Sequence, residues 1–406
     1  MADYLQMTFD IVIVGGGLSG LALAAELARP VFSTLKILVL EQRPHYLRDR
    51  TWSYWRTAQD AHRYSHLERH QWHSWRVRQS QPGDINQPDS VTKNGKAHTY
   101  CSLDGDQFYA AAQHTITQSS HVILRLGVAV RQIVGGVTPR VKTVDGAVIY
   151  ATWIFDARPP MQNNPQRLVQ QFVGIEIKTV GDVFDPTTVE LMHFHPSPDG
   201  LHFFYVLPYS STNALVETTW ISPASLKPDF DAELKRFITH SLGVVDFEVV
   251  YQESGSLNLS DSHSTSDNNK HVVPLGRGAG TLRASTGYAF LETLHHVEKI
   301  AASLERHLVT GKLEQWTPTT FRRSNVDRWM DGIFLKVLER DWATSSRYFM
   351  QLFERLDGDS MVAFLNGKAN LRQRLSVTCV LPTYPFMAQT ISTLIHATPN
   401  FFRGWR

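Results

Sequence analysis

Cysteine is scarce in this sequence, with two residues, Cys101 and Cys379, in a chain of 406. A pair so far apart cannot build a disulfide framework or a cysteine-based metal site. An excess of one charge is also lacking, because 40 Lys and Arg residues face 38 Asp and Glu residues, which leaves a formal net charge of +2. This balance gives no electrostatic argument for a nucleic-acid partner, which normally requires a basic excess or patch.

Long apolar runs are missing too. No stretch of about 18 apolar residues occurs, so we expect no membrane-spanning helix. Residues 1–7 are acidic and do not resemble a secretory signal. The H-E-x-x-H zinc motif is absent. The densest histidine cluster would share one face if its segment were helical, but it lacks a carboxylate ligand, so we expect no metal there. Its members are His62, His66, His70 and His73.

What the sequence does have is a globular composition that is rich in aromatic residues. Hydrophobic residues make up 42% and charged residues 19%, which excludes a largely disordered chain. The 21 Phe, 13 Tyr and 10 Trp residues supply apolar surface for a core or for an apolar ligand. At roughly 150 residues per domain, the length predicts two to three structural units.

The N-terminal region carries the pattern of a dinucleotide-binding unit. A β-branched strand over residues 9–14 runs into a G-x-G-x-x-G loop, and a helical pattern over 21–28 follows. The glycines of the motif are Gly15, Gly17 and Gly20. The first glycine allows a tight turn, the second lets the backbone approach a pyrophosphate, and the third lets helix and strand pack closely. The start of the helix presents N–H groups to the phosphates.

The next strand, residues 36–40, ends at Glu41, which lies 24 positions after Gly17 and can accept a hydrogen bond from a ribose hydroxyl. A single complete fingerprint occurs in the chain. With Arg43 two residues after Glu41, this start is typical of flavoproteins, so we predict FAD rather than a nicotinamide as the bound dinucleotide.

Patterns along the rest of the chain predict a fold of the α/β plus α+β class in three parts. Strands are expected over 121–134 and 141–151, and a further strand over 152–158 is expected to return to the dinucleotide sheet. A helix start near Gly287 could face the flavin, so we include Thr286, Gly287 and Tyr288 among the cofactor-binding candidates. The predicted parts are a Rossmann-type FAD-binding domain (1–60, 100–160 and 271–310), a mostly antiparallel substrate domain (61–99 and 161–270), and a helical C-terminal region (311–406).

Several segments together resemble the bacterial lycopene β-cyclase family, and the resemblance covers nearly the whole chain. Besides the glycine loop, it is carried by T-W-S-Y at 51–54, Q-F-V-G-I-E at 171–176, F-Y-V-L-P at 204–208, A-L-V-E-T at 214–218, S-T-G-Y at 285–288 and F-L-N-G-K at 364–368. The chain departs from the family at Thr218, where a second acid is common, and at Arg283-Ala284, where His-Pro is common.

The resemblance implies an FAD-dependent hydroxylase-like fold and an enzyme that converts the linear ψ-ends of lycopene to β-ionone rings without net oxidation. It implies that FAD acts in its reduced form, with NAD(P)H as a possible upstream reductant. The substrate implied is lycopene or a related linear carotenoid. Because such a C40 hydrocarbon resides in the bilayer, we expect a cytoplasmic protein in peripheral contact with the inner face of the cell membrane. Amphipathic patterns over 334–365 and the aromatic and basic tail 401–406 could form that contact, or the helices could cap the substrate domain.

Lycopene-type cyclisation needs an acid in a dry pocket. Glu217 fits this role, because it lies mid-strand between apolar residues that would raise its pKa, and the family match supports the same residue. Aromatic faces can stabilise the developing cation. The candidates for the substrate pocket are Trp52, Tyr54, Tyr205 and Trp220, each of which could equally belong to the core.

Two other functions share the predicted fold. One is an FAD-dependent monooxygenase that acts on an apolar isoprenoid or aromatic substrate, although the Gly-Asp-Ala-like second motif of aromatic hydroxylases is absent near residues 274–276. The other is a non-catalytic carrier of isoprenoids, against which the acid Glu217 in an apolar strand argues.

Overall fold

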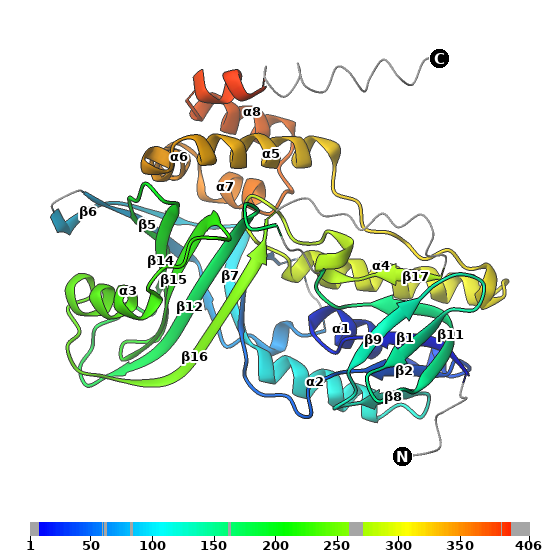
Figure 1. Cartoon of the computed structure of the whole chain (residues 1–406). Coiled ribbons are helices and arrows are strands. Elements are labelled where there is room, and N and C mark those ends of the chain that lie inside the picture. The colour runs from blue at the N-terminus through cyan, green and yellow to red at the C-terminus, as the bar shows by residue number, and fades with distance from the viewer. Residues whose placement is uncertain are drawn as a thin grey trace, which may run out of the picture.

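A computed structural model describes residues 8–390 of the chain, apart from 59, 61–62, 82–83, 161–163, 260–270 and 383. The described chain forms two sheet-containing halves side by side, with a layer of C-terminal helices over one of them (Figure 1). Short helical turns connect the main elements: η1 (Pro30–Phe32), η2 (Ser65–Leu67), η4 (Gly276–Ala279) and η5 (Leu313–Gln315).

The first half contains a seven-stranded sheet with a parallel centre. Strands β8, β2, β1 and β11 run parallel in that order, β17 adds to β11 in parallel, and β10 and β9 continue antiparallel beyond β11. The strands are β1 (Thr8–Val14), β2 (Ile37–Leu40), β8 (Val122–Arg125), β9 (Val130–Val134), β10 (Arg140–Thr143), β11 (Val148–Asp156) and β17 (Val272–Pro274). The return that we expect for the strand over 152–158 is confirmed by the pairing of β11 with β1, and β17 extends the same sheet beside β11.

Residues of β1 are buried on both faces of this sheet, as the β-branched run predicts. Ile11 and Ile13 face the core beneath the helices, whereas Val12 and Val14 face a second core on the other side. The helices on the first face are α1 (Leu18–Leu27), α2 (Gly105–Thr117) and α4 (Phe290–Leu308). Helix α1 lies between α2 and α4 in this layer and contacts both of them (Figure 1).

Two strands that the sequence predicts as continuous are interrupted in the structure. The expected strand over 121–134 is divided into β8 and β9, and the expected strand over 141–151 into β10 and β11. Gly127 lies at one interruption with φ of 73° and Gly146 at the other with φ of 92°. A left-handed backbone turns the chain at these points, which only glycine adopts readily.

The second half is built on a seven-stranded sheet that is antiparallel except for one pair. The order is β16-β12-β15-β14-β13-β5-β6, and β13 pairs with β5 in parallel. The strands are β5 (Ser74–Gln81), β6 (Asp84–Asn94), β12 (Leu168–Thr179), β13 (Thr188–His195), β14 (Leu201–Ser210), β15 (Asn213–Pro223) and β16 (Phe247–Asn258). A small sheet of β3 (Thr51–Thr57), β7 (His98–Asp104) and β4 (His70–Trp72) lies between the two halves.

Helices cover both faces of the second sheet. Helix α3 (Phe230–Arg236) and the π-helical turn η3 (Phe237–Ser241) pack on one face. The other face lies beneath the C-terminal helices (Figure 1). These are α5 (Asn325–Arg340), α6 (Trp342–Arg355), α7 (Gly358–Leu365) and α8 (Leu371–Val380), so the helical pattern expected for this region is confirmed for its described residues. The boundaries that we predict for the three parts stay a prediction.

The histidine cluster does not form one helical face. His66 lies in η2 and His70 in β4, while His62 lies outside the described residues. In the described ranges, no group of three or more His, Cys, Asp or Glu side chains could hold a metal ion. No helix within those ranges is long and apolar enough to cross a membrane.

Candidate active site

The glycine loop leaves an open space at the start of α1. A methyl group added at Gly17 would have no neighbour within 4 Å, whereas one added at Gly20 would collide with the backbone carbonyl of Gly15. Gly15 itself has φ of 99°, which makes the turn from β1 into the helix possible. The space beside Gly17 therefore fits a phosphate group that approaches the N–H groups of a helix start.

Glu41 and Arg43, the other predicted dinucleotide residues, converge on the same loop. The Gly16 N–H donates to Glu41 Oε2 at 2.5 Å, and the backbone N–H and Nε of Arg43 donate to Oε1 at 2.8 and 3.0 Å. Burial alone would raise the pKa of Glu41, but its bonds with Arg43 lower it in sum, so the carboxylate is ionised. An ionised carboxylate retains further acceptor positions for a ribose hydroxyl.

Glu217 occupies a central strand of the second sheet. On β15 it pairs with Gly174 of β12 on one side and with Tyr205 of β14 on the other. Its side chain is half-buried and accepts a hydrogen bond from the Thr219 hydroxyl at 2.7 Å. Burial and the nearby carboxylate of Glu253 raise the pKa of Glu217 from 4.5 to about 8, against the opposing effect of Thr219. At neutral pH this carboxyl therefore carries its proton.

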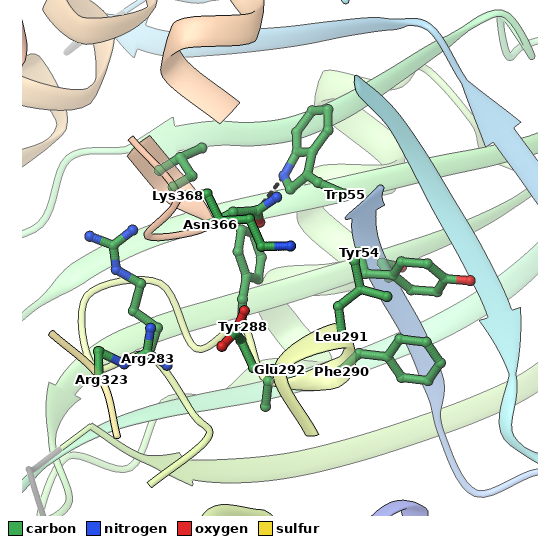
Figure 2. A pocket seen from close by; sticks show the side chains of 13 residues that line it. Tyr54, Trp55, Arg283, Tyr288, Phe290, Leu291, Glu292, Arg323, Asn366 and Lys368 are labelled. Carbon is green, nitrogen blue, oxygen red and sulfur yellow. Dashed lines mark hydrogen bonds between the residues drawn. The ribbon is translucent and has the colours of Figure 1, made fainter. Parts of the chain in front are cut away.

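Aromatic hydroxyl groups surround this carboxyl. Tyr205 lies beside it, and Tyr100 of β7 and Tyr288 lie close enough to interact with each other and with Tyr205. Burial raises the pKa of all three tyrosines, so their phenols are neutral. Trp55 Nε1 donates to the hydroxyl of Tyr288 at 3.3 Å, and Figure 2 shows these two side chains together at one pocket.

Two adjoining pockets meet at Tyr288 and Leu365. The first, drawn in Figure 2, lies between β3, the start of α4 and the chain after α7. The second pocket lies between the seven-stranded sheet of the second half, the turn at 285–288 and helices α6 and α7. Apart from three polar residues, its lining is apolar and aromatic: Gln170, Met192, Phe203, Tyr205, Ile221, Ser285, Thr286, Tyr288, Phe349 and Leu365. An apolar lining with few polar groups is typical of a site for an apolar ligand.

The structure brings some predicted residues together and separates others. Thr286, Gly287 and Tyr288 form the turn beside the second pocket, and Gly287 has φ of 71° there. Trp220 points to the opposite face of the sheet, where it stacks on His202 with ring centroids 4.2 Å apart and donates to Glu233. Because side chains alternate along β15, Trp220 cannot share a face with Glu217.

The aromatic residues of β3 show the same alternation. Trp52 packs against Phe108 in the core of the first half. The ring of Tyr54 stacks on Phe290 at 4.3 Å, on the side of the first pocket away from Tyr288 (Figure 2). Tyr54 also donates to Glu68. The indole that reaches the pocket residues is therefore Trp55, which the sequence analysis did not select.

Sequence reasoning also missed the contacts of Arg283. Its guanidinium is buried and paired with Asp331 of α5 at 2.8–3.1 Å, and it donates to the carbonyl of Phe364 as well. Ser285 donates to Asp331 at 2.7 Å. The position that departs from the family pattern thus anchors the turn at 285–288 to the helical layer. A buried basic residue beside a glycine turn was the available signal.

Solved structures that resemble this chain include flavoproteins and a reductase-like protein. The chain superposes on a geranylgeranyl bacteriochlorophyll reductase-like protein from Thermoplasma acidophilum with a TM-score of 0.61 and 13% identity, over 94% of this chain and 98% of that one. A flavoprotein/dehydrogenase from Cytophaga hutchinsonii superposes with a TM-score of 0.60 and 14% identity, over 97% of this chain and 100% of that one. The flavin-dependent monooxygenase PieE superposes with a TM-score of 0.60 and 12% identity, over 95% of this chain and 72% of that one. The fold is therefore of the FAD-dependent hydroxylase-like class.

Comparison of the sequence with protein-family models identifies the family within this fold class. Residues 10–391 match the family model described as lycopene cyclase protein, so the chain belongs to the lycopene cyclase family, as the resemblance predicts. Over 412 aligned residues the chain is 25% identical to the lycopene beta-cyclase of Paracoccus sp. (strain N81106 / MBIC 01143), with 97% of this chain and 98% of that protein covered.

Proposed function

We propose that this protein is a lycopene β-cyclase that closes β-ionone rings on the linear ψ-ends of lycopene or a related carotenoid. The observation that carries the proposal is Glu217, a carboxyl whose pKa of about 8 leaves it protonated beside an apolar, aromatic pocket. A group that is neutral at pH 7 and still acidic suits general acid catalysis. Membership of the lycopene cyclase family supports the choice of substrate.

In this mechanism Glu217 donates its proton to the terminal alkene of a ψ-end, which leaves a tertiary carbocation. The neighbouring alkene attacks the cation and closes a six-membered ring. Loss of a proton from the ring restores a double bond, so the product is an isomer of the substrate and no oxidant is consumed. The rings of Tyr205 and Tyr288 face the pocket and can stabilise the cation by their π-electrons. Apolar residues such as Phe349 exclude water that would quench it.

The cradle beside Gly17, with Glu41 and Arg43 next to it, fits an FAD, and Thr286 and Gly287 are the candidates near its ring system. In its reduced form, which NAD(P)H could generate, bound FAD would supply negative charge close to the developing cation. The work of the chain's own residues is to hold the cofactor, keep Glu217 protonated and exclude water.

Contact with the bilayer is part of the proposal because the substrate is a membrane-resident hydrocarbon. Apolar side chains are exposed on the outermost helix, α8, and on the residues that follow it, which lie on the far side of the helical layer (Figure 1). They are Leu371, Leu375, Tyr384 and Met387. The apolar residues of the predicted amphipathic patterns over 334–365 are mostly buried against the second sheet, so these helices cap it, and the predicted tail 401–406 lies outside the described residues. We place the protein on the cytoplasmic side, peripheral at the inner face of the cell membrane.

The test is anaerobic turnover of lycopene presented in liposomes, with protein whose FAD has been reduced either by dithionite or by NADPH. We expect Glu217→Gln to retain FAD and sedimentation with the liposomes but to lose activity by at least about 10²–10⁴-fold, the usual contribution of a general acid. The matched control is Glu248→Gln, which neutralises an exposed carboxylate on β16 and leaves turnover intact.

Near-normal turnover by Glu217→Gln at matched flavin content would remove Glu217 as the acid. Oxygen-dependent NADPH consumption with an oxygenated product would replace the cyclase by the monooxygenase. Recovery of bound but unchanged lycopene from the wild type would favour the carrier.

A further inference from the structure

A second carboxylate faces Glu217 across a strand that has no side chain at the point between them. In register, Glu217 of β15, Gly174 of β12 and Glu253 of β16 form one row across the sheet. A methyl group at Gly174 would lie 3.4 Å from Glu217 Cβ and 3.4 Å from Glu253 Cγ. The glycine therefore opens a gap over which the two acidic side chains approach each other on one face.

Glu253 is the more buried and the more firmly held member of the pair. It is 6% exposed, and the hydroxyl of Tyr251 donates to its Oε2 at 2.8 Å. Burial raises the pKa of Glu253 to about 7, while bonds from Tyr251 and from the Thr51 backbone and the charge of Arg48 oppose the rise. Donors that favour the ionised form make Glu253 lose its proton before Glu217 does.

We propose that Glu253 is a positioning residue for the proton of Glu217: once ionised, Glu253 places a negative charge across the gap at Gly174 and thereby keeps the catalytic carboxyl in its acid form. The inference rests on the proposed function. Two like charges in a buried site cannot both form easily, so the ionisation of one carboxyl delays that of the other. The acid is thereby held neutral at a pH where an isolated glutamic acid would be ionised.

The surroundings of both groups are consistent with this division of roles. The groups that face Glu217 from its own and the neighbouring elements are Thr219, Tyr205, Tyr100 and Glu253. None of the first three brings a positive charge. Arg48 is a cation that acts on Glu253, and its guanidinium also lies 3.7 Å from the ring of Tyr251. The positive charge of Arg48 thus stabilises the ionised form of Glu253 rather than that of Glu217.

The experiment follows the pH dependence of turnover in wild type and in Glu253→Gln, with Glu248→Gln as control on the same strand. An acid that works while protonated is active below its pKa and inactive above it. Removal of the neighbouring charge lowers that pKa, so we expect the alkaline limb to move to lower pH by on the order of one unit. Activity at pH 6 should be similar in the two proteins, and at pH 8 about fivefold lower in the variant. Glu253→Asp keeps the negative charge, so the alkaline limb of its pH profile should lie close to that of the wild type.

A second measurement needs no substrate. Infrared absorption of the protonated Glu217 carboxyl, assigned by its loss in Glu217→Gln, should titrate at lower pH in Glu253→Gln. The same shift is expected in Tyr251→Phe, which removes the hydrogen-bond donor that favours ionised Glu253. Because this variant keeps both carboxyls, it serves as the test if Glu253→Gln fails to fold. An unmoved limb together with an unmoved infrared titration would overturn the role of Glu253. A moved titration in a protein that does not cyclise lycopene would refute the proposed function and retain the coupling.

Discussion

Gly17 shows how much a single residue can decide in this fold. The space beside it is empty of protein atoms, and a larger side chain would occupy the position that the cradle offers to a pyrophosphate. We expect Gly17→Val to fold but to carry less than about a tenth of the wild-type FAD, because the backbone can no longer approach the phosphates. Flavin absorbance of the purified protein measures this.

Gly181→Val is the matched control, since Gly181 is exposed and a methyl group there also meets nothing within 4 Å. Its flavin content should equal that of the wild type. Stoichiometric yellow flavin on purified Gly17→Val would contradict the assignment of the cradle.

The residue scale also marks the limit of what the sequence could predict. Glu217 could be selected from the sequence as the candidate acid, because an acid in an apolar strand is uncommon and the family resemblance favours the same residue. Glu253 could not be selected, because its proposed role depends on which strand pairs with which, and on a glycine in the strand between them. Trp55 was missed for a related reason: the side of β3 that reaches the Tyr288 hydroxyl is set by the tertiary structure. Of the two residues predicted on β3, Tyr54 lines the first pocket, whereas Trp52 packs in the core of the first half.

At the scale of elements, the turn at 285–288 depends on its attachment to α5. The buried pair of Arg283 and Asp331 has exposed fractions of 2% and 3%. Loss of one partner leaves a buried charge without compensation, which costs about 3–5 kcal/mol in proteins. We expect Asp331→Asn to lower the free energy of unfolding by roughly that amount, as measured by denaturant titration.

The comparison for this prediction is the exposed pair of Arg29 and Glu305, whose side chains are 33% and 40% exposed. Glu305→Gln should cost at most about 1 kcal/mol. Equal stability of Asp331→Asn and the wild type would show that the turn is held by other contacts.

Elements were the scale at which sequence patterns predicted most. The β-branched run, the glycine loop and the helix after it form β1 and α1 as expected, because local propensity and burial favour the same structure there. The mostly antiparallel character of the second sheet was also predicted. The breaks at Gly127 and Gly146 were not, since a glycine within a strand pattern can also be accommodated without a turn.

At the scale of the whole molecule, a charged cluster joins the loops of the first half to the second sheet. Glu176 of β12 is 3% exposed and lies 2.7 Å from both Arg48 and Arg69, which come from segments far earlier in the chain. Burial alone would raise the pKa of Glu176, but these two arginines lower it to about 2. Such joints between distant segments are not visible in a linear sequence, which explains why sheet order and the contact between halves could not be predicted.

The depressed pKa of Glu176 has a consequence for stability against acid. Its contribution is fully present above the unfolded value of 4.5 and is lost as the pH falls toward 2. The difference corresponds to about 3 kcal/mol. We expect the wild type to lose about 2 kcal/mol more stability between pH 5 and pH 3 than Glu176→Gln does, in urea titrations at each pH, with the remainder lost below pH 3. Parallel pH profiles for the two proteins would mean that the cluster does not titrate with folding.

The position of Glu217 within the sheet has one more consequence. Its strand is paired on both sides, with β12 and with β14, so the backbone that carries the carboxyl cannot move toward a ligand. In the proposed reaction, a long flexible substrate must instead advance until the correct carbon reaches the proton of Glu217. The fixed place of the carboxyl in the sheet would then determine which atom of the substrate is protonated, so the distance that the substrate chain can reach would set the regioselectivity.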